Sequence, residues 1–151
     1  MITRSFISQD KDIRWIQRFH NYRKALARLS NAIEKYREEE SDEVIQAGMI
    51  KFFEMTYELA WKTLQDLLRD RQRPNSNGGP NVIITQALAD GYMTDGDGWR
   101  KLKKSREMTS HEYDEETADE IAESIASVYF PLLIQLETRL QLEKIQQEKQ
   151  S

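Results

Sequence analysis

The sequence contains no cysteine, only three prolines and six glycines, and no long hydrophobic run. The absence of cysteine excludes disulfide bonds, thiolate nucleophiles and cysteine-ligated zinc, and nothing points to an oxidising compartment. The first residues, Met1 to Phe6, lack the apolar segment of a signal peptide, and no window approaches the roughly 20 apolar residues of a membrane span. We therefore expect a soluble, cytoplasmic protein that does not associate with membranes.

The sequence is instead rich in charge and in helix-forming residues. Of its 151 residues, 38% are hydrophobic and 32% are charged, a balance that favours long solvated helices over an all-β architecture. The length matches one ordinary domain. We therefore expect a single all-α domain over residues 1–151, with a core from about residue 12 to residue 142.

Hydrophobic residues recur every three or four positions in three long segments, which is the pattern of amphipathic helices. A loop rich in glycine, proline and asparagine separates the second long segment from two shorter helical segments. In chain order the expected elements are a helix over about 12–39, a helix over about 42–70 with Ser41 or Asp42 as N-cap, a loop over 71–80, short helices over 82–88 and 98–108, and a long helix from 115.

Together these segments predict an antiparallel up-down bundle of three long and two short helices. Pro131 lies inside the last helix and cannot donate a backbone hydrogen bond, so we expect a kink near residues 127–131. The polar tail after residue 143 is expected to fray. The apolar stripes are wide enough to suit a homodimer, although a well-filled monomer core would account for them equally.

Positive charge is concentrated in one short segment, although the net charge of −4 opposes nucleic-acid binding by the molecule as a whole. Five of the seven residues from Arg100 to Arg106 are basic. Arg100, Lys103 and Lys104 are therefore candidates for binding RNA or another phosphate group. The alternative is an ordinary solvated helix face, which is what most charge runs are.

The stretch from Arg106 to Tyr113 joins the short basic helix to the last long helix, and function concentrates at such junctions. Histidine titrates near neutral pH and moves protons, while arginine neutralises phosphate charge with a planar fork of donors. His111 as general acid or base and Arg106 as phosphate ligand could cleave RNA without a metal, because RNA supplies its own 2′-hydroxyl nucleophile. The spacing alone is also common in residues with a purely structural role.

The remaining polar candidates have simple structural explanations. Glu58 lies four residues before Lys62, which suits a surface ion pair, although Glu58 could instead orient Arg106 or His111. No metal site is expected, because nothing supplies ligands at helical spacing around His20. No cofactor is expected either, since Asn77-Gly78-Gly79 lacks the following residues of a phosphate loop.

An ordered set of residues from about Trp15 to Leu140 resembles the nucleotidyltransferase substrate-binding family, which belongs to the HEPN superfamily and includes the HepT toxins. The residues that carry the resemblance are Trp15, Arg18-Phe19, Ala25-Leu26, the run Thr56-Tyr57-Glu58-Leu59-Ala60-Trp61-Lys62, Trp99, and Arg106 with Thr109-Ser110-His111-Glu112-Tyr113.

The resemblance implies a homodimeric HEPN-type bundle that pairs with a minimal nucleotidyltransferase as its antitoxin, in a type VII toxin–antitoxin system. In HepT-like members the equivalents of Arg106 and His111 form a ribonuclease site from both subunits. The equivalent of Tyr113 receives AMP from the partner, which silences the toxin. Glu58, Ser110 and Glu107 are then candidates for supporting this site.

One residue departs from the family pattern. The position after the arginine usually holds a small polar residue, and here it holds Glu107, whose longer carboxylate could repel substrate or pair with Arg106. Three hypotheses therefore stand: a HepT-like, metal-independent endoribonuclease, a non-catalytic subunit that binds substrate or nucleotide for a nucleotidyltransferase, and a helical scaffold.

Overall fold

The computed structural model describes residues 13–150, and within that range it contains only helices and the turns that join them. This confirms the all-α helical bundle. The helices are α2 (Arg14–Glu38), α3 (Glu43–Asp70), α4 (Pro80–Ala89), α5 (Gly96–Thr109), α6 (Glu115–Ser124), the π-helical turn η1 (Ile125–Tyr129) and α7 (Phe130–Gln150). In the described part of the chain, no helix is both long enough and apolar enough to cross a membrane.

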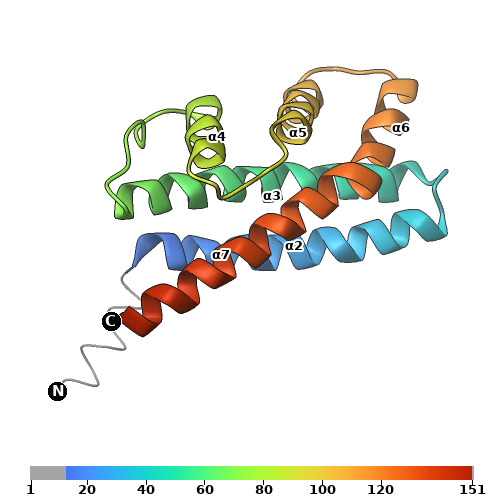
Figure 1. Cartoon of the computed structure of the whole chain (residues 1–151). Coiled ribbons are helices and arrows are strands. Elements are labelled where there is room, and N and C mark those ends of the chain that lie inside the picture. Colours follow the sequence, from blue (N-terminus) through green and yellow to red (C-terminus); the bar gives the residue numbers. More distant parts are fainter. Residues whose placement is uncertain (1–12, 151) are drawn as a thin grey trace.

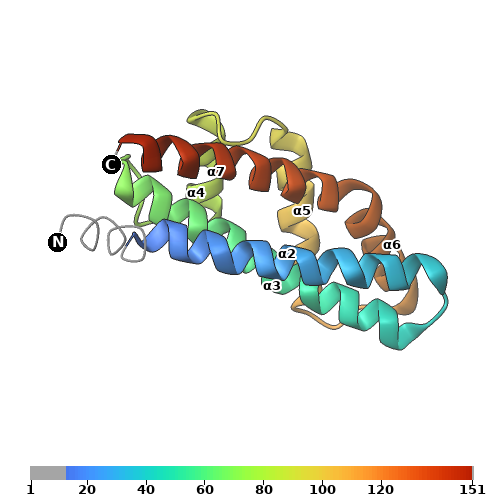
Figure 2. The same ribbon diagram turned by 90° about the horizontal axis from the view of Figure 1, so that it is seen from below.

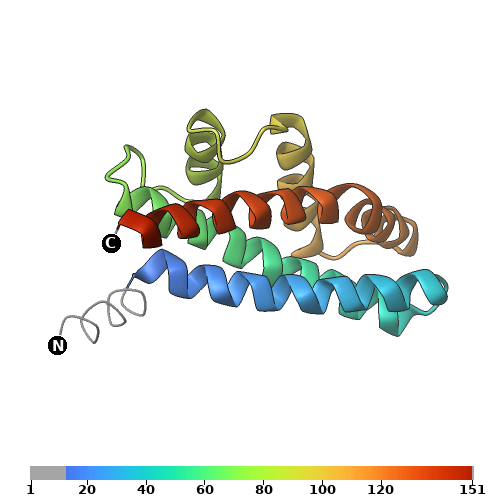
Figure 3. The ribbon, with the colours of Figure 1, turned by 60° about the horizontal axis from the view of Figure 1, so that its bottom comes forward.

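The long helices α2, α3 and α7 lie side by side, and α2 runs antiparallel to the other two (Figure 1, Figure 2). The short helices α4 and α5 pack on the side of α3 that faces away from α2 (Figure 3). They carry the chain back along α3, so that α6 begins near the start of α3 and α7 runs in the same direction as α3. Strict up-down alternation is therefore interrupted by α4 and α5.

The core follows the predicted helical stripes. Large side chains from α2 and α3 are buried at three- and four-residue spacing, including Phe19, Leu26, Phe53 and Leu64. Burying such a side chain contributes about 1.5–3 kcal/mol relative to leaving it exposed. The Tyr22 hydroxyl donates a hydrogen bond of 2.6 Å to a backbone carbonyl of α7, which satisfies the polar end of a fully buried ring.

Aspartates fix where three of the helices begin. Asp42 accepts hydrogen bonds from two amides in the first turn of α3, Asp95 accepts one from α5, and Asp114 accepts one from α6. A side chain at this position satisfies amides that have no partner inside the helix. Gly91, with a φ of 85°, turns the chain after α4 in a conformation that favours glycine.

The expected kink takes the form of the π-helical turn η1. Pro131 has no N–H group to bond the carbonyl of Ser127, and the amide of Phe130 bonds the carbonyl of Ile125, five residues back. The helix axis changes direction between α6 and α7 (Figure 1). The wider turn buries Tyr129 beside α5, which affects the candidate site described below.

In the structure α7 continues as a helix to Gln150, past residue 143, where the sequence predicts the tail to fray. Trp15 donates a hydrogen bond of 2.9 Å to Gln147, and Arg71 bonds both Gln147 and Glu143. These contacts connect the tail to α2 and to the end of α3. The sequence pattern missed them because they join polar side chains that are distant in the chain.

Candidate functional site

The candidate site lies where α5 ends and α6 begins. Arg106 occupies the last turn of α5, and His111 and Tyr113 follow in the connecting turn. Tyr129 of η1 fixes α5 in place, because its hydroxyl lies 2.7 Å from that of Ser105 and donates to a backbone carbonyl of α5. The Tyr129 ring also stacks on Phe53 of α3. The π-helical turn therefore helps to hold the helix that carries Arg106.

Arg106 is half-buried and forms an ion pair with α3. Its Nη1 atom lies 3.2 Å from Oε2 of Glu54, and the two side chains are 26% and 19% exposed. The Thr109 hydroxyl donates to the same Glu54 oxygen at 3.1 Å and lies 2.8 Å from the carbonyl of Arg106. Glu54 and Thr109 thus hold the guanidinium in one orientation at the protein surface.

Two buried polar atoms near this ion pair have no hydrogen-bond partner within the described residues. They are Nε of Arg106 and the hydroxyl of Tyr57, which projects from α3. Burial raises the pKa of the Tyr57 hydroxyl, and the carboxylates of Glu107 and Glu58 raise it further. An unsatisfied buried polar group costs about 1–3 kcal/mol. Such groups are rare enough that a pair of them in one region marks that region as a functional candidate.

His111 and Tyr113 are exposed in the α5–α6 turn. The backbone amide of His111 donates to the carbonyl of Met108, which continues the last turn of α5, and Asp114 then caps α6. The Tyr113 side chain is 37% exposed. No hydrogen bond or ion pair joins Arg106 to His111 in the part of the chain that the structure describes. Both predicted reacting groups are therefore accessible, on one short turn beside Arg106.

Glu107 does not pair with Arg106, contrary to one possibility raised by the sequence. Lys103, one turn earlier on α5, donates to the Glu107 carboxylate instead. This hydrogen bond lowers the pKa of Glu107, and the charge of His111 contributes in the same direction. Lys103 is therefore the basic partner of Glu107, and Glu54 is the acidic partner of Arg106.

The other predicted supporting residues also bond elsewhere. The Ser110 hydroxyl donates to the carbonyl of Glu107 at 2.7 Å and so caps the end of α5. Glu58 pairs with Lys62 at 3.3 Å and accepts a hydrogen bond from the Trp61 indole. No hydrogen bond or ion pair joins either side chain to Arg106 or His111. The predicted surface ion pair between Glu58 and Lys62 is thus present in the structure.

The basic segment of α5 is only partly available for phosphate. Arg100 pairs with Asp97, and Lys103 pairs with Glu107, so both charges are compensated locally. Lys101 and Lys104 are exposed and form no ion pair within residues 13–150. Of the three predicted phosphate ligands, Lys104 is the one whose charge is uncompensated by the described part of the chain.

A strongly acidic cavity of about 510 Å³ lies between the α2–α3 turn and α6. Its carboxylates repel each other, and the proximity of Glu43 raises the pKa of Glu115. Such a cavity is unsuited to phosphate. No cluster of three or more histidine and carboxylate side chains in residues 13–150 could hold a metal ion. The acidic lining consists of Glu40, Glu43, Glu115, Asp119 and Glu123.

The sequence pattern missed three residues of this site. Glu54 lies one helical turn before Glu58 and was not recognised because an isolated glutamate on a long helix carries no signal of its own. Thr109 belongs to the motif, but its hydrogen bond to Glu54 depends on how α5 crosses α3. Tyr57 lies at core spacing and is indeed buried, so only its hydroxyl, without a partner in the described residues, distinguishes it from packing residues.

A comparison with known families now adds to this geometry. A family model described as nucleotidyltransferase substrate binding protein like matches residues 17–142. The match covers most of the helical bundle and all of the residues from Glu54 to Tyr113. No curated protein matches the chain. The chain therefore belongs to the nucleotidyltransferase substrate-binding protein-like family.

Proposed function

We propose that this protein is a HepT-like toxin: a metal-independent endoribonuclease whose activity is silenced by a cognate minimal nucleotidyltransferase. The observation that supports this most directly is the placing of an exposed histidine and an exposed tyrosine on one short turn beside a half-buried arginine. This arrangement combines a proton-transfer group, a phosphate ligand and a modifiable hydroxyl.

In the proposed reaction, Arg106 binds the phosphodiester and offsets the negative charge that develops on its oxygens. His111 takes the proton from the 2′-hydroxyl as the 2′-oxygen attacks phosphorus. The bond from phosphorus to the 5′-oxygen breaks, and the leaving oxygen receives a proton from the histidine of a second copy or from water. The products are a 2′,3′-cyclic phosphate and a 5′-hydroxyl end, and no metal is required.

The proposal includes a homodimer and a protein partner. A homodimer would bring two copies of the α5–α6 turn to one RNA-binding cleft, which would provide both the general base and the general acid. The partner would silence the site by transferring AMP to Tyr113, with the phenol oxygen attacking the α-phosphate of ATP and pyrophosphate leaving. The bulky anionic product beside Arg106 would exclude RNA.

The test is cleavage of a labelled RNA pool in EDTA by purified protein whose unmodified state has been verified by intact mass. The wild type is compared with His111→Ala and with His20→Ala. His20 is the only other histidine and lies exposed on α2, so it is a matched control. Cleavage by wild type and His20→Ala, with cyclic phosphate ends, and none by His111→Ala, would support the ribonuclease.

A second candidate function is a non-catalytic subunit that binds substrate or nucleotide for the nucleotidyltransferase. The observation that favours it is the Arg106–Glu54 ion pair, which occupies the cation that a ribonuclease would need for phosphate. If unmodified wild type fails to cleave RNA but binds nucleotide in calorimetry, and Arg106→Ala binds it equally well, this candidate replaces the first.

A further inference from the structure

The outer face of α2 carries an unbroken line of basic and amide side chains. Seven residues, spaced three or four positions apart, lie within an arc of roughly 100° around the helix axis. Every one of them is exposed. The line extends over about 30 Å at 1.5 Å per residue. We call it the α2 stripe, and it comprises Arg14, Gln17, Asn21, Lys24, Arg28, Asn31 and Lys35.

The four cations of the α2 stripe are uncompensated. None of them forms an ion pair with another residue of the described chain, whereas most of the cations on α5 and α7 pair with a carboxylate. The stripe itself contains no acidic residue. The two carboxylates of α2 itself, Glu34 and Glu38, lie near the Lys35 end of the stripe.

The chemistry of the stripe suits binding to an anionic polymer backbone better than binding to a protein partner. Protein interfaces bury a central apolar or aromatic cluster and are depleted in lysine. The stripe has no apolar residue, and it offers only ammonium, guanidinium and amide groups. Lysine, arginine, asparagine and glutamine are among the side chains that contact nucleic-acid phosphates. Their charge complements a phosphodiester chain, and their even spacing along a straight helix suits an extended polymer.

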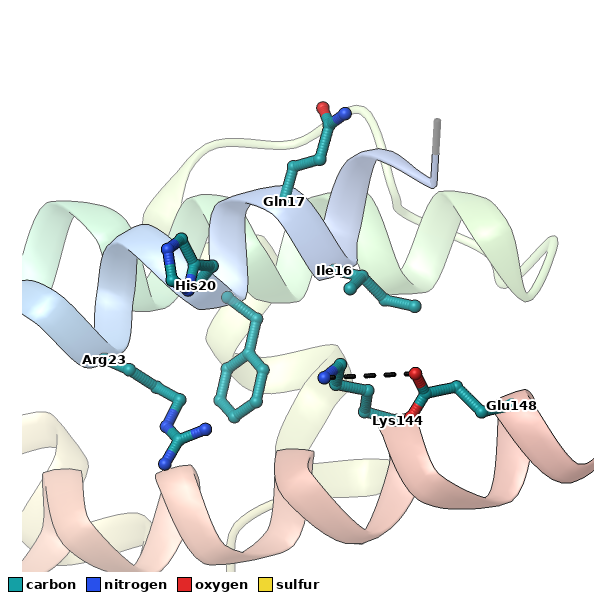
Figure 4. Close-up of a pocket in the computed structure, with 7 residues that line it drawn as sticks. Ile16, Gln17, His20, Arg23, Lys144 and Glu148 are labelled. Atoms are coloured by element: carbon teal, nitrogen blue, oxygen red, sulfur yellow. Dashed lines mark ion pairs between the residues drawn. The ribbon is translucent and has the colours of Figure 1, made fainter. Parts of the chain in front are cut away.

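The stripe is separate from the site around Arg106. Helix α2 lies on the opposite side of α3 from α5 (Figure 1, Figure 3). At its beginning the stripe borders a groove of about 280 Å³ between α2 and α7, where Gln17 points away from α7 and His20, Arg23 and Lys144 line the edges (Figure 4). The two cations of this groove are paired with carboxylates of α7, Arg23 with Glu137 and Lys144 with Glu148, so the uncompensated charge belongs to the stripe itself.

We propose that the α2 stripe is a binding surface for the phosphodiester backbone of single-stranded RNA, apart from the cleavage site. The inference rests on the proposed function only in its choice of RNA as the polyanion. Binding is measured separately from cleavage, so failure of one does not imply failure of the other. An acidic protein surface would be the competing occupant, and the test includes it.

The test measures binding of a fluorescein-labelled oligouridine by fluorescence anisotropy over a range of salt concentrations. All proteins are the full chain and carry His111→Ala, so that no cleavage occurs. The double substitution Lys24→Gln and Arg28→Gln should weaken binding roughly tenfold at low salt. It should also reduce the slope of log K against log salt by about 1.4. A slope change of that size corresponds to two lost phosphate contacts.

The matched control replaces Lys62 and Arg73 with Gln, which removes the same charge at positions already paired with Glu58 and Asp90. This control should bind within twofold of its parent and keep its slope. Equal losses for the two double variants would overturn the proposal, because they would indicate a general charge effect. Displacement of the RNA by polyglutamate at lower concentration than by unlabelled oligouridine would overturn it in favour of an acidic protein partner.

Discussion

Arg18 and Arg106 lie on different helices, and each pairs with a carboxylate of helix α3. The surroundings of the two pairs differ. Arg18 of α2 donates through Nε to Asp66 at 2.7 Å, and the Asp66 side chain is only 2% exposed. Arg106 of α5 pairs with Glu54 through Nη1 at the longer distance of 3.2 Å, and its Nε is buried without a partner in the described residues. The first pair satisfies its groups and the second does not.

We interpret this difference as one between a structural region and the proposed functional site. Around Arg18 the buried polar groups are paired, as stability requires. Around Arg106 an arginine nitrogen and a tyrosine hydroxyl remain unsatisfied, and a histidine and a tyrosine are exposed on the adjoining turn. Functional sites commonly retain local strain of this kind because their groups are arranged for a ligand. Substitutions at the two pairs should therefore affect different properties.

The largest expected effect is on the proposed RNA cleavage. Arg106→Lys retains the positive charge but loses the planar fork of donors, so RNA cleavage in EDTA should fall by about 100-fold, the usual cost of one transition-state donor. Arg18→Lys should leave cleavage nearly unchanged. Initial rates at fixed protein concentration measure both. Equal losses in the two variants, with equal falls in melting temperature, would mean that Arg106 is structural.

The free energy of unfolding should depend more on the Arg18–Asp66 pair than on the Arg106–Glu54 pair. Asp66→Ala leaves a half-buried guanidinium without its carboxylate, and we expect a loss of about 2–3 kcal/mol, somewhat below the range for fully buried pairs because Arg18 is 32% exposed. Glu54→Ala should cost about 1 kcal/mol, since its pair is longer and both groups reach solvent. Urea unfolding followed by circular dichroism gives both values. A larger loss for Glu54→Ala would remove the distinction between the two pairs.

Much of the fold could be predicted from the sequence, because it depends on local patterns. The periodic apolar residues of α2 and α3, the cap at Asp42 and the missing amide of Pro131 all act within a few residues of their own positions. The helical end of α7 could not be predicted, because it depends on bonds from Trp15 and Arg71, which are distant in the chain.

The candidate site likewise contains residues that a local motif predicts and residues that only the fold brings together. Arg106, His111 and Tyr113 follow a short motif that can be recognised from residue types and spacing, and the family match includes them. Glu54 is more than 50 residues away from Arg106, and its role depends on how α5 crosses α3. The supporting roles predicted for Glu58 and Ser110 depend on contacts of this distant kind, and in the structure both side chains bond residues of their own helix.

Two buried tyrosines test the unsatisfied hydroxyl directly. Tyr57→Phe removes a group that has no partner in the described residues, so the free energy of unfolding should stay within about 0.5 kcal/mol of wild type or rise. Tyr22→Phe removes a hydroxyl bonded to the Leu133 carbonyl at 2.6 Å and should cost about 1 kcal/mol or more. Thermal unfolding of both variants and of wild type measures these differences in stability. A clear loss for Tyr57→Phe would show that its hydroxyl is satisfied in solution.

The smallest expected effect concerns an exposed ion pair that lies outside both regions. Glu123 of α6 accepts hydrogen bonds from Arg37, Ser127 and Tyr36, and these lower its pKa from about 4.5 to about 2. Because the folded-state pKa is depressed, the stabilisation is present above the unfolded-state pKa and is lost as pH falls from about 4.5 to about 2.

The Glu123 side chain is 51% exposed, so solvent screening should limit this contribution to less than about 1 kcal/mol. Glu123→Gln should therefore be slightly less stable than wild type at pH 7, and the difference should disappear near pH 2. The control is Glu34→Gln, at an exposed carboxylate of α2 that forms no ion pair within residues 13–150. Urea midpoints across this pH range measure both variants. If Glu123→Gln and Glu34→Gln differ from wild type equally at every pH, the depressed pKa of Glu123 makes no contribution to stability. A surface ion pair with several hydrogen bonds would then stabilise the bundle less than the Arg18–Asp66 pair does.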